Sequence, residues 1–328
     1  MRFSLIAPTF SRPDEVQEFL ESLCSQNYAH FEVIIADGSP NNDVEPVVQK
    51  YTSSLDLVYL YRKFLPVSDA RNWAAEKASG DWLIFLDSDC LIPADYLLHV
   101  SKFLEENKVD LFGGPDRAHA DFTATQKAIN YAMTSVLTTG GIRGAKKHIG
   151  VFHPRGFNMG IRKSAFFDVQ GYATDFKCGE DIELSMRLIE KGYASAFIPD
   201  AFVYHKRRTD FKKFFKQVFR FGAARINIWQ RHPNELKLTH MFPSAFLLFC
   251  ISIPFQYLLC PNLSCLSALM LLFYSMANLI LASVQNKNLY VGFLSLMAAF
   301  VMLFGYGWGF LRNFWEVKIK ANKQGLNL

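Results

Sequence analysis

The sequence predicts an α/β domain followed by a helical region that associates with a membrane. Three observations support this fold class: short apolar strands alternate with helical patterns over residues 1–110, a basic block lies between Lys206 and Lys237, and three apolar runs follow it. The β-α alternation is typical of a parallel sheet with helices on both faces. A chain of 328 residues is long enough for one large domain and an additional module.

The elements of the α/β domain are expected in a regular order. Strands are predicted over residues 3–7, 31–36, 57–61 and 82–86, with helices over 13–26, 44–51 and 68–78 between them. In such sheets a ligand binds beyond the carboxyl ends of the strands. Polar residues follow three of these ends, at Pro8-Thr9, at Asp37 and at Asp87-Ser88-Asp89, and we expect them to converge on one crevice.

Residues 111–205 are less regular. A helix is predicted over 122–139, a Gly- and Lys-rich loop over 140–150, and a strand with a turn over 153–166. A strong helical pattern at 180–191 begins with Glu180 and Asp181, and a helix dipole favours acidic residues at that end. The pattern at 197–205 predicts a final strand that ends at His205.

The basic block directly precedes the apolar runs. It contains ten Lys and Arg against two acidic residues, a net of +8 in a chain whose total is +5. This position fits the positive-inside rule and an anionic lipid surface better than nucleic acid, which is the competing partner. Aromatic residues alternate with lysines over 211–229, which predicts a basic amphipathic helix in the membrane interface. An ordinary surface helix of the α/β domain is the alternative.

Residues 243–311 contain three apolar runs, over 243–260, 263–284 and 289–311, and Lys287 is the only charged residue in this region. Each run has about the 20 residues with which a helix crosses a bilayer, so two to three transmembrane helices are expected. No signal peptide precedes the first strand, which predicts a multi-pass inner-membrane protein with residues 1–242 in the cytosol. Three spans would place the basic tail 312–328 outside, against the positive-inside rule, so one run, such as 243–260, could be re-entrant or interfacial.

Several polar residues are of types that carry chemistry in such a crevice. Asp87 and Asp89 can chelate a divalent cation, although acidic pairs also occur in solvated turns. A carboxylate of Glu180 or Asp181 can act as a general base, or can simply stabilise the start of its helix. His205 is either a metal ligand or a packed histidine.

Two further candidates open the predicted helix at 68–78. There the side chains of Arg71 and Asn72, together with amide N–H groups, can bind phosphate oxygens. The six cysteines are scattered through the chain and indicate neither a disulfide framework nor a zinc cluster.

Seven short motifs give the sequence a family resemblance. They are PTF (8–10), ADGS (36–39), DARN (69–72), DSD (87–89), RGFNMG (155–160), GED (179–181) and FVYH (202–205). In this order they resemble the family-2 glycosyltransferases with a GT-A fold, over about residues 1–205. The C-terminal runs resemble the membrane anchors of bacterial members that build surface polysaccharides. The resemblance implies a Rossmann-like mixed sheet in 1–205, a basic interfacial segment over 206–242, a transmembrane region over 243–311 and a basic tail over 312–328.

The resemblance also implies roles for individual residues. Asp37 would hold the nucleotide base or ribose with Pro8 and Thr9, since Ala36 replaces the family's first acidic residue. Asp181 would be the inverting base, with Glu180 beside it. The remaining nucleotide-sugar contacts would be Arg71, Asn72, Asp87 and Ser88. The ligands of a divalent metal, Mn²⁺ or Mg²⁺, would be Asp87, Asp89 and His205. The acceptor contacts would be Arg155, Asn158, Gln217 and Arg220.

The implied activity is inverting transfer of one sugar from a nucleotide-diphospho-sugar to a lipid-linked, polyprenyl-diphosphate saccharide acceptor, at the surface of membrane lipids. Gln217 and Arg220 partly match the Q-x-x-R-W signature of processive polysaccharide synthases, but Phe221 replaces the Trp. A processive synthase is therefore one alternative. A non-catalytic membrane scaffold with a degenerate nucleotide-binding domain is another, and the oligomeric state is left open.

Overall fold

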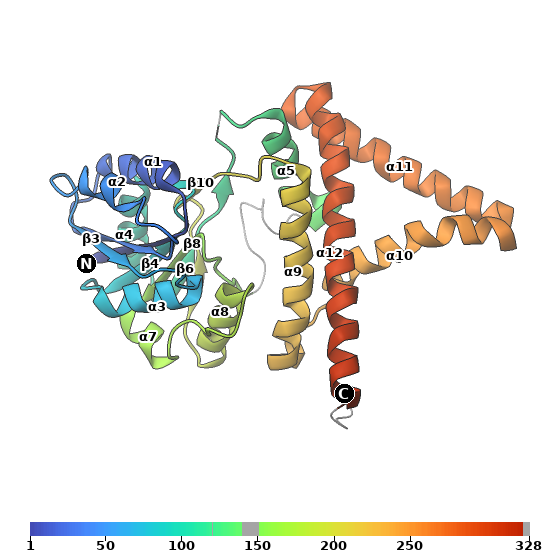
Figure 1. Ribbon diagram of the computed structural model, residues 1–328. Helices are drawn as coiled ribbons and strands as arrows, with labels where there is room; N and C mark the ends of the chain where they lie inside the picture. The colour runs from blue at the N-terminus through green and yellow to red at the C-terminus, as the bar shows by residue number, and fades with distance from the viewer. Residues whose placement is uncertain (120, 140–150, 324–328) are drawn as a thin grey trace. The chain divides into compact units, whose positions relative to one another are not determined.

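A computed structural model describes residues 1–119, 121–139 and 151–323 of the chain. The chain divides into an α/β unit and a helical unit (Figure 1). The α/β unit comprises the described residues of 1–119 and 145–206, and the helical unit comprises those of 120–144 and 207–328. The predicted loop at 140–150 and the end of the tail at 324–328 lie outside the described residues.

The α/β unit is built on a mixed sheet of seven strands in the order β3-β2-β1-β4-β8-β6-β9. The first four strands of the chain run parallel, as the β-α alternation predicts. In contrast, β8 runs antiparallel to both of its neighbours, β4 and β6. The strands are β1 (Phe3–Thr9), β2 (Phe31–Asp37), β3 (Leu57–Tyr61), β4 (Trp82–Leu86), β6 (Leu111–Gly113), β8 (Asn158–Arg162) and β9 (Ser195–Phe197).

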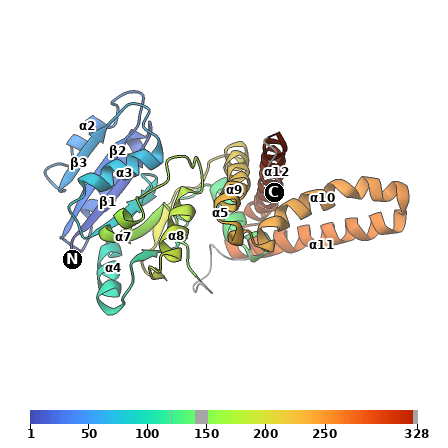
Figure 2. The ribbon, with the colours of Figure 1, turned by 90° about the horizontal axis from the view of Figure 1, so that it is seen from below.

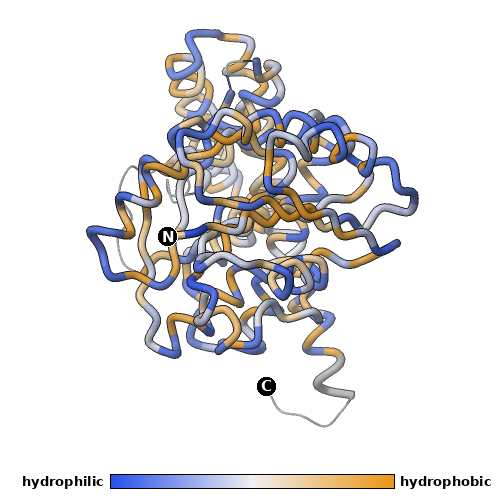
Figure 3. The backbone as a smooth tube through the Cα atoms, turned by 90° about the vertical axis from the view of Figure 1, so that its left-hand side faces the viewer, coloured by the Kyte–Doolittle hydropathy of each residue, from blue (hydrophilic) through white to orange (hydrophobic). Residues whose placement is uncertain are grey.

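Helices cover both faces of this sheet because successive side chains of a strand point to opposite faces. Val33 and Ile35 of β2 belong to the apolar cluster that contains residues of α1 (Pro13–Cys24), α2 (Glu45–Gln49) and α4 (Tyr96–Glu106). Ile34 and Ala36 belong to the opposite cluster, with residues of α3 (Val67–Lys77), α7 (Lys163–Asp168) and α8 (Glu180–Glu190). Figure 3 shows apolar strands, in orange, surrounded by more hydrophilic segments.

The predicted strand at 197–205 is wrong. The chain instead forms β9 in the large sheet and β10 (Val203–His205) in a second sheet of order β5-β10-β7. A turn at Pro199-Asp200 separates them, and Pro199 has no N–H to donate to a ladder. In the second sheet His205 pairs with Cys90 of β5 (Cys90–Leu91), and β7 (Asp116–Arg117) flanks the other side of β10.

The helical unit contains the three long apolar helices that the sequence predicts. These helices are α10 (Leu238–Leu259), α11 (Pro261–Asn286) and α12 (Leu289–Lys323), each long and apolar enough to cross a membrane. α12 continues beyond the predicted run at 289–311 without a break. The predicted helix at 122–139 is interrupted at Ser135, whose extended backbone separates α5 (Ala124–Thr134) from α6 (Val136–Thr139).

The predicted amphipathic helix is α9 (Phe211–Arg231), and protein covers its apolar face. Phe214 and Val218 belong to one buried cluster with Ala298 of α12 and Ala128 of α5. Glycines allow α9 and α12 to approach closely. A Cβ atom added at Gly222 would overlap the Tyr306 carbonyl oxygen, and one added at Gly309 would overlap the Phe219 carbonyl oxygen.

We expect Gly309→Ala to weaken the contact between α9 and α12. The added methyl group has no space against the Phe219 backbone, and overpacking of this kind costs about 1–3 kcal/mol. The measurement is the thermal midpoint of the full chain in detergent. Met297→Ala, at an exposed position of the same helix, is the matched control. Equal midpoints for the two variants would show that the helices can separate at no cost.

Candidate active site

The polar ends of the parallel strands lie along one edge of the sheet, as predicted. In the register of β1 and β2, Thr9 pairs with Asp37, and β4 lies on the other side of β1. Asp87, Ser88 and Asp89 follow β4 in a turn that the hydrogen bond from the Cys90 N–H to the Asp87 carbonyl closes at 3.0 Å. The Thr9 hydroxyl is buried without a hydrogen-bond partner among the described residues, so it is a group that a bound ligand could satisfy.

Asp37 is fully buried at the end of β2. One carboxylate oxygen accepts the Ser39 N–H at 2.8 Å and the Ser39 hydroxyl, and the other accepts the Tyr59 hydroxyl at 2.8 Å. Burial first, and then the Asp37 charge, raise the pKa of Tyr59 well above its usual range, so Tyr59 stays a donor. In this arrangement Asp37 holds the loop after β2, and its contact with a nucleotide remains a prediction.

Arg71 of α3 joins two acidic residues that are far apart in the sequence. Its guanidinium donates to Asp87 Oδ1 at 2.9 Å and to Glu180 Oε1 at 2.8 Å, and its side chain is only 4% exposed. The guanidinium carbon lies 5.2 Å from the centre of the Tyr172 ring. Burial alone would lower the pKa of Arg71, but Tyr172 and the surrounding carboxylates raise it, so the guanidinium remains charged. Arg71 therefore bridges carboxylates, which the sequence did not indicate.

Glu180 and Asp181 begin α8 after Gly179, which has a positive φ of 84°. Burial, followed by the neighbouring charge of Asp181, raises the pKa of Glu180, while Arg71 opposes this effect. Asp181 is partly exposed and accepts the Gly156 N–H at 2.9 Å and the Ile182 N–H at 2.8 Å. Two backbone donors thus orient the Asp181 carboxylate, and the same contacts fix the Gly156 segment against α8.

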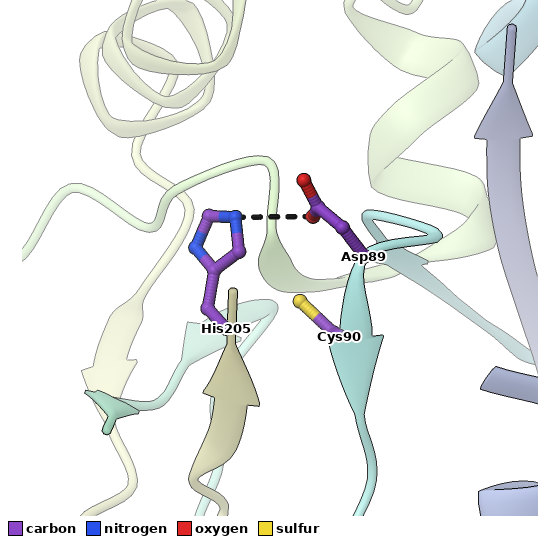
Figure 4. A group of neighbouring side chains, drawn as sticks. All are labelled: Asp89, Cys90 and His205. Carbon is purple, nitrogen blue, oxygen red and sulfur yellow. Dashed lines mark ion pairs between the residues drawn. The ribbon is translucent and has the colours of Figure 1, made fainter. Parts of the chain in front are cut away.

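Asp89 and His205 form a second polar group in the site (Figure 4). His205 Nε2 lies 3.1 Å from Asp89 Oδ1, and the imidazole stacks on Phe157 with ring centres 5.1 Å apart. Asp116 lies on the other side of the ring, with its Oδ2 3.9 Å from His205 Nδ1. Potential ligand atoms of Asp89, Cys90 and His205 all lie within 4.8 Å of one another.

Cys90 and Arg12 complete the surroundings of Asp89. Burial, with the nearby acidic residues, raises the pKa of the Cys90 thiol well above its ordinary value, and its Sγ lies 3.8 Å from the Phe157 carbonyl oxygen. Arg12 Nη1 donates to Asp89 Oδ2 and to Glu15 Oε2, both at 2.9 Å. Arg12 therefore balances part of the negative charge of this group.

Two residues that were predicted to contact ligands, Asn72 and Asn158, have hydrogen-bond partners within the protein. Asn72 exchanges hydrogen bonds with the backbone of Tyr172, at 2.9 Å and 2.8 Å, and so places that ring beside Arg71. Asn158 is fully buried, accepts the Tyr96 hydroxyl at 2.6 Å and donates to the Ala201 carbonyl at 2.8 Å. These contacts hold Asn158 in the core, and its predicted contact with an acceptor stays a prediction.

The remaining acceptor candidates lie in different units. The Arg155 carbonyl accepts the Asn158 N–H at 2.8 Å and closes a turn in the α/β unit. Gln217 and Arg220 lie on α9 in the helical unit, and their predicted contacts with an acceptor stay predictions.

Sequence reasoning missed four residues of the site. Arg12 and Asp116 contact the Asp89–His205 group, Tyr172 contacts Arg71, and Tyr59 contacts Asp37. A local signal existed for Arg12, which follows the polar end of β1 within SRPDE. The other three are recognised only once the strands are in register.

The mixed sheet and the carboxylates at its strand ends define a GT-A domain, the fold of nucleotide-diphospho-sugar transferases. The chain belongs to glycosyl transferase family 2, whose family model matches residues 4–169.

Relatives over most of the chain carry glycosyltransferase names. Glycosyltransferase AglE of Haloferax volcanii is 23% identical over 74% of this chain and 78% of its own length. The dolichyl N-acetyl-α-D-glucosaminyl phosphate 3-β-D-2,3-diacetamido-2,3-dideoxy-β-D-glucuronosyltransferase of Methanococcus voltae is 26% identical over 97% of this chain and 98% of its own length. The solved mannosyltransferase of Pyrobaculum calidifontis, in complex with GDP-Man and Mn²⁺, superimposes with a TM-score of 0.60 at 17% identity, covering 96% of this chain and 87% of that chain. The structural similarity to this mannosyltransferase establishes the fold.

Proposed function

We propose that this chain transfers one sugar, with inversion, from a nucleotide-diphospho-sugar to a lipid-linked saccharide. The observation that carries the proposal is the carboxylate of Asp181, which two backbone N–H groups orient. Asp181 lies in the first turn of α8, beside Glu180, to which Arg71 donates a hydrogen bond. Three apolar helices in the same chain fit an acceptor that resides in a membrane. The Methanococcus voltae relative, whose name includes a dolichyl phosphate sugar, supports the same acceptor class.

The residues around Asp89 fit a divalent cation of the Mn²⁺ or Mg²⁺ type. Asp89 offers a carboxylate and His205 an imidazole nitrogen, 3.1 Å apart and facing one another, and Asp87 precedes them in the same turn. Carboxylate oxygens suit both cations, and the imidazole nitrogen favours Mn²⁺ over the harder Mg²⁺, whereas a protonated thiol such as Cys90 is a poor ligand. A bound cation would neutralise charge on the leaving nucleoside diphosphate. The solved mannosyltransferase complex with GDP-Man and Mn²⁺ supports this choice.

In the proposed reaction Asp181 takes the proton of the acceptor hydroxyl as that hydroxyl attacks the anomeric carbon. The Gly156 and Ile182 N–H groups hold the carboxylate in place. Arg71 holds Asp87 and Glu180 and limits the repulsion among the acidic residues. Thr9, Asp37 and Ser88 would contact the nucleotide part of the donor. The proposed location is the cytosolic face of the inner membrane.

The proposal is tested with the purified full chain. It is incubated with UDP-, GDP- and dTDP-sugars and a polyprenyl-diphosphate-linked sugar, and nucleoside diphosphate release is followed. We expect a single added sugar whose anomeric configuration, read by NMR, is opposite to that of the donor. A ladder of products would indicate a processive synthase, and retained configuration would exclude Asp181 as an inverting base.

We expect Asp89→Asn to weaken Mn²⁺ binding, because the amide removes one anionic ligand beside His205. The loss should reach or exceed the roughly 10- to 100-fold that removal of a supporting group costs a metal site. Binding of Mn²⁺ to the donor-free protein is measured by electron paramagnetic resonance. Asp95→Asn, at the exposed start of α4, is the matched control. Unchanged binding in Asp89→Asn would place the metal elsewhere.

A further inference from the structure

Apart from Leu289 at its start, the large exposed apolar side chains of α12 lie on one face of the helix. Their spacings along the helix are 3, 4, 11, 7 and 4 residues, each close to a whole number of helical turns, and every residue from 298 to 307 is at least partly buried. The large exposed residues of this face are Tyr290, Phe293, Met297, Trp308, Trp315 and Ile319. A single apolar face with aromatic residues is typical of a helix that lies in a membrane interface.

The helices α10 and α11 differ from α12 in their exposure. They form a hairpin whose outer half is held by contacts within the hairpin, such as Ser267 Oγ to Gln256 Oε1 at 2.7 Å and Ser264 Oγ to the Ile253 carbonyl at 3.1 Å. Large apolar side chains are exposed around much of both helices there, including Phe255, Leu258, Leu259, Leu266, Met270 and Phe273. With 22 and 26 residues, both helices are long enough to cross the hydrocarbon core.

The hairpin and α12 point in different directions within the helical unit. Figures 1 and 2 show both hairpin helices leading away from α9 and α12, which run side by side. The inner part of the hairpin contacts α12, as Ser244 Oγ to the Gly307 carbonyl at 3.3 Å and the Phe246–Phe300 ring pair show. The hairpin and α12 therefore cannot both cross the bilayer along its normal.

The charges of α9 indicate whether α12 or the hairpin of α10 and α11 crosses the bilayer. Gly309 of α12 lies against Phe219 of α9, and four residues on, Asn313 Nδ2 donates to the Ala223 carbonyl at 2.7 Å and to Asn227 Oδ1 at 2.8 Å, so the two helices run in the same direction. α9 carries six basic residues and no acidic one: Lys212, Lys213, Lys216, Arg220, Arg225 and Arg231. If α12 crossed the bilayer, α9 would bring these charges into the hydrocarbon core. If the hairpin crosses instead, the charges lie at the level of the lipid headgroups.

We infer that α10 and α11 are the two membrane spans and that α9 and α12 lie in the interface of one leaflet. The number of spans is then even, so the end of α12 returns to the side of the residues that precede α10. This places the basic residues of α9 together with Arg312 and Lys318 on one side and satisfies the positive-inside rule. The prediction that one apolar run is interfacial thus applies to α12 and not to α10.

Single-cysteine chains test this topology in membrane vesicles of one orientation. A membrane-impermeant maleimide is applied before and after permeabilisation to three full-length variants. The first keeps only Cys24 of the α/β unit, the second keeps only Cys260 at the hairpin turn, and the third is Cys-free with Lys318→Cys on α12. All three positions are exposed in the structure. Correct folding is checked by the thermal midpoint, and the readout does not require transferase activity.

We expect the thiols at positions 24 and 318 to react from the same side and Cys260 to react from the opposite side. A thiol at 318 that reacts from the side of Cys260 would show that α12 is a third span and would overturn the inference. Reaction of Cys260 from the side of Cys24, or from neither side, would show that the hairpin does not cross and would also overturn it.

Discussion

Asp181→Asn is expected to reduce sugar transfer by about 10²- to 10⁴-fold, the range that a positioned general base contributes. The asparagine side chain has nearly the same shape, and its one carbonyl oxygen can still accept the Gly156 or the Ile182 N–H. It cannot accept a proton from the acceptor hydroxyl. The measurement is the initial rate of nucleoside diphosphate release with donor and lipid-linked acceptor, and donor binding should be almost unchanged.

Two further variants serve as controls for Asp181→Asn. Asp200→Asn, at an exposed position on the turn before β10, should leave the rate unchanged. Glu180→Gln should lower the rate less than Asp181→Asn, since Glu180 is held by Arg71 and supports the site indirectly. Full activity in Asp181→Asn would assign the base to another residue, and lost donor binding would show that Asp181 acts in binding.

The parallel half of the sheet could be predicted from the sequence because its physical cause is local. In β1, β2 and β4, apolar residues alternate between two buried faces; β1 and β2 end at a polar residue, and Asp87 directly follows β4. Parallel strands place these ends along one edge, which is why Thr9, Asp37 and Asp87 could be expected near one another. β8 lies within the strand and turn predicted at 153–166, but no local signal indicates that it runs antiparallel to its neighbours.

The partners within the site could not be predicted because they depend on distant residues. Arg71 contacts Glu180 across 109 positions of the chain, and the sequence pattern only indicated that both were polar residues near helix starts. His205 reaches Asp89 because β10 pairs with β5, a strand of two residues without a recognisable pattern. Similarly, composition marks α12 as a possible span, and only its contacts with α9 distinguish its two faces.

The second large effect concerns stability and is expected for Arg71→Met. This substitution keeps the apolar bulk beside Tyr172 but removes the positive charge that Asp87 and Glu180 share. Removing one partner of a buried ion pair leaves an uncompensated charge and costs about 3–5 kcal/mol. For a unit of this size the thermal midpoint should fall by on the order of 10 °C. Arg162→Met, which breaks a surface pair with Asp110, should cost at most about 1 kcal/mol.

The pH dependence of Arg71→Met separates lost charge compensation from lost packing. The pKa of Glu180 is already raised in the folded protein, and Arg71 is the neighbouring charge that lowers it. Without Arg71 the folded-state pKa should rise further above the unfolded value of about 4.3, so protonation favours the folded state. The deficit in stability should therefore shrink as the pH falls toward about 4, and Arg71→Met combined with Glu180→Gln should recover part of it at neutral pH. A deficit that is the same at all pH values and in the double variant would mean that Arg71 acts by packing alone.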